Sequence, residues 1–183
     1  MTREQAMEIL TEYTKSESLL KHAYAVEAAM RAYAKKFGED EDLWGVVGLL
    51  HDFDYEMFPD QHPMKGSEIL KEKGVPEEIR VAILGHADFS GVPRETLMAK
   101  TLYAVDELSG FITAVTLVRP TRALSEVKFK SVKKKLKDKS FAAKVNREEI
   151  TRGAEELGVD FQEHVEFVIQ AMSKVADRLG LNP

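Results

Sequence analysis

The sequence predicts an all-α fold, a bundle of about eight or nine helices. Apolar residues recur at spacings of three and four along most of the 183-residue chain, as expected for amphipathic helices. No segment sustains a two-residue alternation, and no Asn-Gly or Asp-Gly pair closes a β-hairpin. The length suits one domain of ordinary size, so we expect residues 1–183 to form a single domain.

The first half of the chain divides into five predicted helices with clear breaks between them. Ser16 provides an N-cap for the second helix, and Gly38 favours the left-handed conformation that ends it. Asp40 or Glu41 opens the third helix. Pro63 and the proline at position 76 suit the first turn of a helix, where a missing N–H costs nothing. The predicted ranges are residues 2–13, 16–36, 40–52, 63–74 and 76–90.

The second half predicts four more helices. Residues 94–118 form one long helix that Arg119-Pro120 ends, and residues 125–138 form a lysine-dense helix. Asn146 caps a helix over residues 147–157, and Asp160 caps the last one, which runs to about residue 179. No flexible linker separates residues 121–183 from the preceding part, so we expect them to pack on it.

Composition excludes several classes of protein. Apolar residues make up 44% of the chain, which is enough to offset the entropy of ordering and excludes global disorder. The chain has no cysteine, so any metal must be held by His and carboxylate groups.

The apolar runs at residues 43–50 and 111–118 are too short to span a bilayer, and the N-terminus does not resemble a signal peptide. We therefore expect a cytoplasmic protein with no membrane partner. The net charge of −5 argues against general nucleic-acid binding.

Two carboxylates occupy unusual positions. Asp52 follows His51 directly after the apolar run at residues 46–50, and Asp106 lies inside the apolar stretch at residues 102–108. A buried carboxylate without a partner is costly. A divalent metal with neutral imidazole ligands would compensate both carboxylates.

The order His22, His51-Asp52, Asp106 resembles the metal-binding signature of the HD-domain superfamily of metal-dependent phosphohydrolases. Residues 62–70, His-Pro-Met-Lys-Gly-Ser-Glu-Ile-Leu, are similar to the HPxxGxxIL element of its HD-GYP-type and related dinuclear members. Residues 82–93 resemble their His-containing element, and residues 104–120 resemble their final helix. The resemblance implies an HD-domain helical bundle with a metal-binding core at about residues 19–120 and residues 121–183 packed on it.

The resemblance also implies a ligand set for one or two divalent ions. Asp52 would bridge the two ions, and a water or hydroxide between them would be the nucleophile. Oxygen and nitrogen ligands suit Mn, Fe, Mg, Co or Ni. The implied ligands are His22, His51, Asp52 and Asp106 for the first ion, and Asp52, His62 and His86 for the second.

Three departures argue against hydrolysis of cyclic dinucleotides. Tyr55 stands where HD-GYP-type members have the lysine of HDxxK, and Ala87 replaces the second of their paired histidines. Their Gly-Tyr-Pro is Gly-Val-Pro at residues 91–93. The implied ligands themselves are all present.

Other polar residues have two interpretations each. Asp54 is either a solvated loop acid, like Glu56 and Asp60, or a group that orients a ligand histidine or relays a proton; we favour the first. For Asp88, two residues after His86, we favour a proton relay. Because either acid could relay a proton, Asp54 and Asp88 join Asp52 as candidate catalytic residues. We interpret His164, which follows Glu163, as an ordinary core or surface residue.

The segment from Lys128 to Lys144 contains eight lysines and one acid. Its default interpretation is a solvated helix face, but apolar residues at 129, 132, 136 and 141 indicate that it packs on something. Beside the metal centre, its cations would attract an anionic substrate. Nucleic acid is a weaker candidate, because no aromatic stacking platform accompanies the lysines. The residues nearest in sequence to the Asp106 helix are the predicted substrate-binding residues: Arg119, Arg122, Lys128 and Lys130.

The preferred hypothesis is a metal-dependent phosphohydrolase acting on a small phosphate ester or nucleotide. One alternative is an HD-type di-iron oxygenase, because some members of the superfamily use a similar set of four histidines and two aspartates to activate oxygen. The other is a binding module that senses a nucleotide through a decayed site. No oligomeric state is predicted.

Overall fold

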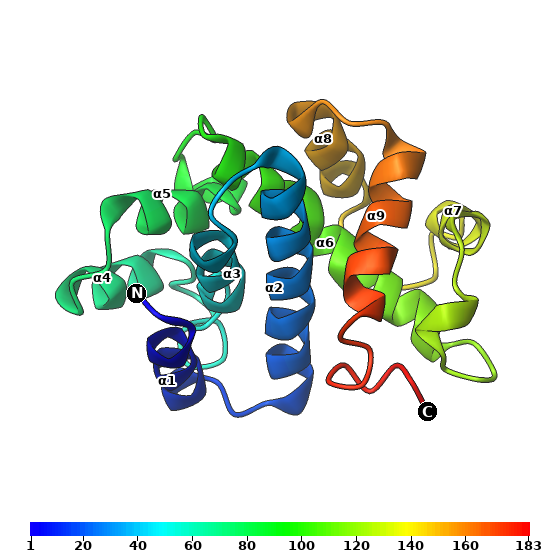
Figure 1. Ribbon diagram of the computed structural model, residues 1–183, viewed down its shortest axis with the longest axis horizontal. Coiled ribbons are helices and arrows are strands. Elements are labelled where there is room, and N and C mark those ends of the chain that lie inside the picture. The colour runs from blue at the N-terminus through cyan, green and yellow to red at the C-terminus, as the bar shows by residue number, and fades with distance from the viewer.

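The computed structural model describes residues 1–183 as nine α-helices joined by loops and two short 3₁₀ turns, with no β-strand. This confirms the predicted all-α fold, and Figure 1 shows the order of the helices. The helices are α1 (Arg3–Tyr13), α2 (Glu17–Phe37), α3 (Glu41–Leu50), α4 (Met64–Glu72), α5 (Glu77–Gly85), α6 (Leu97–Leu117), α7 (Phe129–Lys137), α8 (Arg147–Leu157) and α9 (Phe161–Ser173).

The predicted N-caps are present in the structure. The side chain of Ser16 accepts a hydrogen bond from the third residue of α2, and Asp40, Asn146 and Asp160 cap α3, α8 and α9 in the same way. Gly38 ends α2 with a φ of 71°, a left-handed conformation that glycine adopts without steric cost. The local signals in the sequence therefore fix most helix boundaries.

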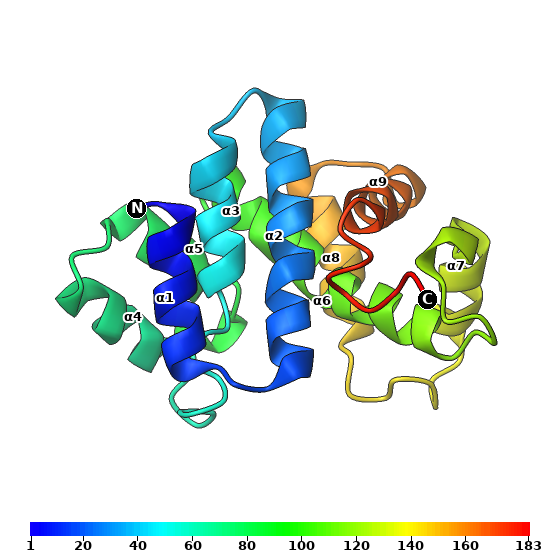
Figure 2. The same ribbon diagram turned by 60° about the horizontal axis from the view of Figure 1, so that its bottom comes forward.

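Four predicted helices are clearly longer than the observed ones. The helix expected over residues 76–90 ends at Gly85, and a separate 3₁₀ turn covers Asp88–Ser90. The helix expected from residue 94 begins at Leu97, because Thr96 caps it and the Arg94 side chain bonds to the Gly85 carbonyl instead. The lysine-dense helix begins at Phe129 after a 3₁₀ turn. Helix α9 ends at Ser173, and the chain then folds back so that the carbonyl of residue 181 accepts from the amide of residue 124. Figure 2 shows this terminal segment lying across the end of α6.

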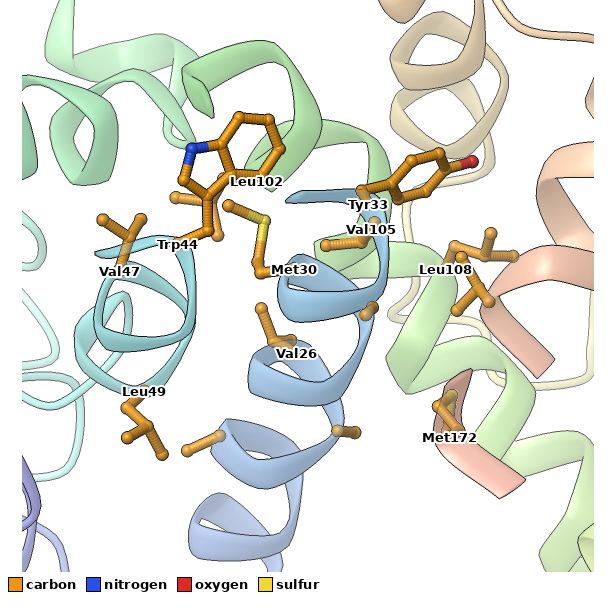
Figure 3. Close-up of a cluster of buried hydrophobic side chains, with 14 of the residues drawn as sticks. Val26, Met30, Tyr33, Trp44, Val47, Leu49, Leu102, Val105, Leu108 and Met172 are labelled. Atoms are coloured by element: carbon orange, nitrogen blue, oxygen red, sulfur yellow. The ribbon is translucent and has the colours of Figure 1, made fainter. Parts of the chain in front are cut away.

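The core lies around α2 and α6, the two longest helices, with α3 packed along α2. Figure 3 shows Val26 and Met30 of α2 between Trp44 of α3 and Val105 of α6. All of these side chains are buried within one hydrophobic cluster of 40 residues. Such burial is the main stabilising term, about 25 cal/mol for each Å² of apolar surface. No helix combines the length and the apolar character that crossing a membrane requires.

Two close helix contacts depend on glycine. A Cβ at Gly48 would lie 2.9 Å from Cα of Glu27, and one at Gly153 would lie 2.7 Å from Cα of Ala104. These glycines let α3 approach α2 and let α8 approach α6. Helices α8 and α9 also pack on each other, and α9 lies against α2. The apolar side of α7 packs on the rest of the protein as predicted, because Val132 on that side is fully buried.

Candidate metal centre

Four histidines and two aspartates from separate parts of the chain meet at one end of the α2–α3–α6 core. Helix α2 carries His22 near its beginning, and α6 carries Asp106 near its middle. His51 is the C-cap of α3, so Asp52 enters the turn that follows. His62 comes from the loop before α4, and His86 is the C-cap of α5. Helix ends thus place most of these groups.

The first group consists of His22, His51, Asp52 and Asp106. Its four potential ligand atoms lie within 4.8 Å of one another. Oδ1 of Asp106 is 2.9 Å from Nε2 of His22 and 3.1 Å from Nε2 of His51. Oδ2 of Asp52 is 3.1 Å from the same nitrogen of His51. One cation at the centre of this group could contact all four side chains.

The second group uses the other oxygen of Asp52. Its Oδ1 lies 3.2 Å from Nε2 of His62 and 3.2 Å from Nε2 of His86. Asp52 therefore faces the first group with Oδ2 and the second group with Oδ1. This arrangement is suited to a carboxylate that bridges two ions.

Hydrogen bonds hold three of the imidazoles with Nε2 toward the centre. We assign Nδ1–H of His51 as the donor to the Gly48 carbonyl at 2.7 Å, and Nδ1–H of His86 as the donor to the Ile83 carbonyl. Nδ1–H of His62 donates to a carboxylate. A partner on the second nitrogen is the usual support of a metal-ligating histidine, because it fixes the tautomer and leaves the Nε2 lone pair free.

The charges of the centre call for a cation. Nε2 of His51 is 3.2 Å from Nε2 of His22, and because Nδ1–H of His51 is used on the Gly48 carbonyl, a neutral His51 turns its Nε2 lone pair toward two carboxylates. Burial acts to lower the pKa of His51, but the charges of Asp52 and Asp106 raise it well above its usual value. The same His51 charge holds the pKa of both carboxyls well below their usual range against the effect of burial. A divalent ion would supply this compensation without protons, so the residues present fit a metal.

The profile of the HD-domain family matches residues 19–110, just over half of the chain. The chain belongs to the HD-domain family. The match supports membership of a superfamily of metal-dependent hydrolases and includes all six candidate ligands, but it identifies no HD-GYP-type subgroup. Comparison with curated proteins and with solved structures gave no significant match.

Asp54 corrects one of our expectations. We favoured a solvated loop acid, but Asp54 is only 1% exposed in this HD domain. Its Oδ1 accepts from Nδ1 of His62 at 2.6 Å, and its Oδ2 accepts from the backbone amide of Gly66 at 2.8 Å. The alternative interpretation, a group that orients a candidate ligand, describes its position. Burial acts to lower the pKa of His62, but the hydrogen bonds that its ring donates to Asp52 and Asp54 raise it to about 9.

Glu56, in the same loop, is exposed as expected and has a structural contact that the sequence did not indicate. Its carboxylate accepts from the backbone amides of Lys15 and Ser16, at 2.9 and 2.8 Å. This ties the loop after Asp52 to the beginning of α2, the helix that carries His22.

Asp88 lies at the rim of the cavity in front of the candidate metal centre. Its Oδ1 accepts from Nη1 of Arg94 at 2.8 Å, and its Oδ2 accepts from Nη1 of Arg152 at 3.0 Å. Both oxygens are thus held by guanidinium groups. These two ion pairs hold the carboxylate in place at the rim, whereas we had predicted a proton relay for it.

The cavity measures about 500 Å³, and no lysine or arginine lines it. Two of its acids, Glu107 and Glu149, were not predicted as site residues. Burial and the charge of Asp106 raise the pKa of Glu107 to about 7. Glu149 comes from α8, so only the packing of α8 on α6 reveals it. Two aromatic side chains also border the cavity, Tyr55 at 47% exposure and Phe89 at 72%.

The predicted substrate-binding cations do not border this cavity. Arg119, Lys128 and Lys130 line a separate cavity. Arg122 borders a third cavity of about 480 Å³, which it shares with His22.

The fifth histidine lies apart from the candidate centre. His164 is buried in the core, accepts from the Tyr33 hydroxyl and donates to the Ala104 carbonyl. It is a satisfied core residue, as predicted.

Proposed function

We propose that this HD domain hydrolyses a small phosphate ester, with a nucleoside monophosphate as the preferred class, and that it does so with two divalent ions. The observation that carries the proposal is the position of Asp52, which presents one oxygen to each of two ligand groups. A single-metal site would need only the first group. Paired ions about 3.5–4 Å apart are a common arrangement in phosphate-ester hydrolysis.

The proposed ligands are the six residues predicted from the sequence. When bound, divalent ions acidify a water ligand and neutralise charge on the phosphate. The protein holds the ligand atoms for them: the core helices fix His22 and Asp106, and carbonyl groups fix the rings of His51 and His86. Manganese, iron, magnesium, cobalt and nickel all suit this set.

The residues around the ligands have separate proposed roles. Asp54 orients His62 rather than relaying a proton. Asp88, held by two arginines, positions the rim of the cavity. Glu107 and Glu149 line the cavity and offer oxygens to hydroxyl or amine groups of the substrate.

The cavity lining favours a substrate with few negative charges. No lysine or arginine is available there to bind additional phosphates, so the metal ions would have to match the charge of the substrate. The exposed rings of Tyr55 and Phe89 offer an apolar surface beside the candidate centre. A nucleobase is a flat group that such rings can contact by stacking. These two features support a nucleoside monophosphate over a polyphosphate.

The test is release of inorganic phosphate by protein loaded with manganese, iron or cobalt. The panel contains p-nitrophenyl phosphate, nucleoside monophosphates and nucleoside triphosphates. We expect turnover of monoesters, and we expect Asp52→Ala to remove both ions and nearly all activity. The matched control is Asp60→Ala, which removes an exposed acid of the same loop. Absence of turnover of every ester by protein that carries two ions per chain would refute the proposal.

A second candidate is oxidation of a polyol or phosphonate with molecular oxygen. The acidic lining favours it, because carboxylates such as Glu107 and Glu149 bind hydroxyl groups well and repel phosphates. Oxygen uptake that depends on iron and on such a substrate would favour this candidate. Hydrolysis supported by manganese without oxygen would exclude it. A decayed nucleotide sensor is disfavoured, because all six ligand side chains are present and converge.

A further inference from the structure

A second cavity lies between the end of α6 and the beginning of α7, and it has the opposite charge to the first. It measures about 630 Å³, a size typical of sites for small ligands. Glu126 is the only carboxylate that borders it. The cations that border it are Arg119, Lys128, Lys130, Lys134 and Lys135.

These cations have no carboxylate partners. None of the five takes part in an ion pair, although ten pairs involve other lysines and arginines of the chain. Lys135 lies 4.9 Å from the centre of the Phe141 ring. The chain as a whole carries a net charge of −5, so the positive charge of this cluster is opposite in sign to the net charge. Like charges gathered at one cavity repel one another, and a bound anion would relieve that repulsion.

Arg119 is the most constrained member of the cluster. Its Nη1 makes one long contact, 3.4 Å, with the hydroxyl of Ser131, and its buried Nε–H has no acceptor. A guanidinium group normally binds carboxylate or phosphate through paired N–H groups. The N–H groups of Arg119 therefore make fewer hydrogen bonds in the free protein than a guanidinium group can make.

The beginning of α7 borders the same cavity through Lys128, Lys130 and Ser131. Lys128 is the N-cap of this nine-residue helix, its side chain makes no capping bond, and no acid occupies the first turn. The backbone amides of residues 129–131 have no acceptor. Free N–H groups and the helix dipole favour an anion at this position.

The cavity is distinct from the candidate metal centre. No residue borders both cavities. Arg119 follows Asp106 by 13 positions along and just beyond α6, which at about 1.5 Å per residue places them roughly 20 Å apart. A small anion bound here cannot also reach the metal ligands. From the cavity, the unpaired cations and the free amides together, we propose that this site binds a small compound bearing a chain of two or more phosphates.

The experiment measures binding of inorganic tripolyphosphate by calorimetry at near-physiological ionic strength. It uses the purified protein first and then the same protein after dialysis against a chelator. We expect saturable binding of one tripolyphosphate per chain in both samples, because no metal ligand borders the cavity. Binding that disappears with the metal would place the anion at the metal centre and overturn the proposal.

Two pairs of lysine substitutions on the same segment separate a defined site from general attraction. Lys128→Ala with Lys130→Ala removes two cations of the cavity and should weaken binding about tenfold or more. Lys133→Ala with Lys137→Ala removes two exposed cations of α7 that do not border the cavity, and should change affinity less than about twofold. Equal losses in both pairs, or tighter binding of a single-stranded oligonucleotide than of tripolyphosphate, would overturn the proposal. Because all four lysines are exposed, the variants should keep the melting temperature of the parent protein.

Discussion

Replacing Asp54 by Asn tests whether the second ligand group binds a metal. The carboxylate accepts two N–H groups, from His62 at 2.6 Å and from Gly66 at 2.8 Å. An amide has only one oxygen, so Asp54→Asn turns an NH₂ group toward one of these donors whichever way it is oriented. Loss of such support for a ligand histidine typically weakens metal binding about 10- to 100-fold, which corresponds to about 1.4–2.7 kcal/mol.

The assay counts metal ions per chain by elemental analysis while a chelator competes for them. Wild-type protein should hold two ions, and Asp54→Asn should lose the ion at His62 first and keep the ion at His22 and Asp106. Asp60→Asn, an exposed acid in the same loop, is the control. Unchanged retention of both ions, or equal loss of both, would refute the reasoning.

A second substitution perturbs the Asp54 carboxylate through its other hydrogen-bond partner, Gly66. A Cβ at Gly66 would lie 2.8 Å from Cγ of Asp54, so Gly66→Ala should displace the carboxylate without changing its charge. If orientation of His62 is what matters, this variant should also weaken the second ion selectively. A circular dichroism spectrum like that of the wild type would show that the fold is retained.

Three further outcomes follow from the geometry. His164→Ala should leave metal content unchanged and lower the unfolding free energy in urea by about 2–4 kcal/mol, because Tyr33 and Ala104 lose a buried partner. Gly153→Ala should cost about 1–3 kcal/mol in the same assay by forcing α8 from α6, and a smaller effect would contradict the close contact. In metal-free protein His62 has a pKa raised to about 9, so its stabilising effect is complete below about pH 6.5 and is lost as pH rises to 9, which pH-dependent urea unfolding can measure. Stability that rises over this range would contradict the proposed state of His62.

The helices and the candidate ligands could be predicted because their signals are local or carry a fixed order. Ser16 and Gly38 act on their own helix ends, so the neighbouring sequence is enough to place them. Asp52 follows His51 directly after one apolar run, and Asp106 lies inside another. Both positions place a carboxylate where burial is costly, and a metal ion compensates that negative charge. Convergence of these groups needed only the two core helices and the end of α3 to pack together.

The surroundings of the centre could not be predicted because they depend on packing between distant segments. Asp54 sits among acids in a loop, and nothing in its neighbours distinguishes it from Asp60, yet the loop folds so that only Asp54 is buried. Glu149 reaches the cavity because Gly153 lets α8 lie against α6. Nearness in sequence to Asp106 was a poor guide to the basic residues, since a helix separates residues along its axis.

The charge around the centre makes the proposed ions necessary for binding an anion as well as for chemistry. Asp52, Asp54 and Asp106 contribute three negative charges, Glu149 adds a fourth, and Glu107 adds part of a fifth near neutral pH because its pKa is about 7. The charge of Asp88 is already matched by two arginines. With one divalent ion the sum of these charges remains negative, and a phosphate ester is repelled. With two ions the sum comes close to zero, so the repulsion of an anion is removed only when the second ligand group is also occupied.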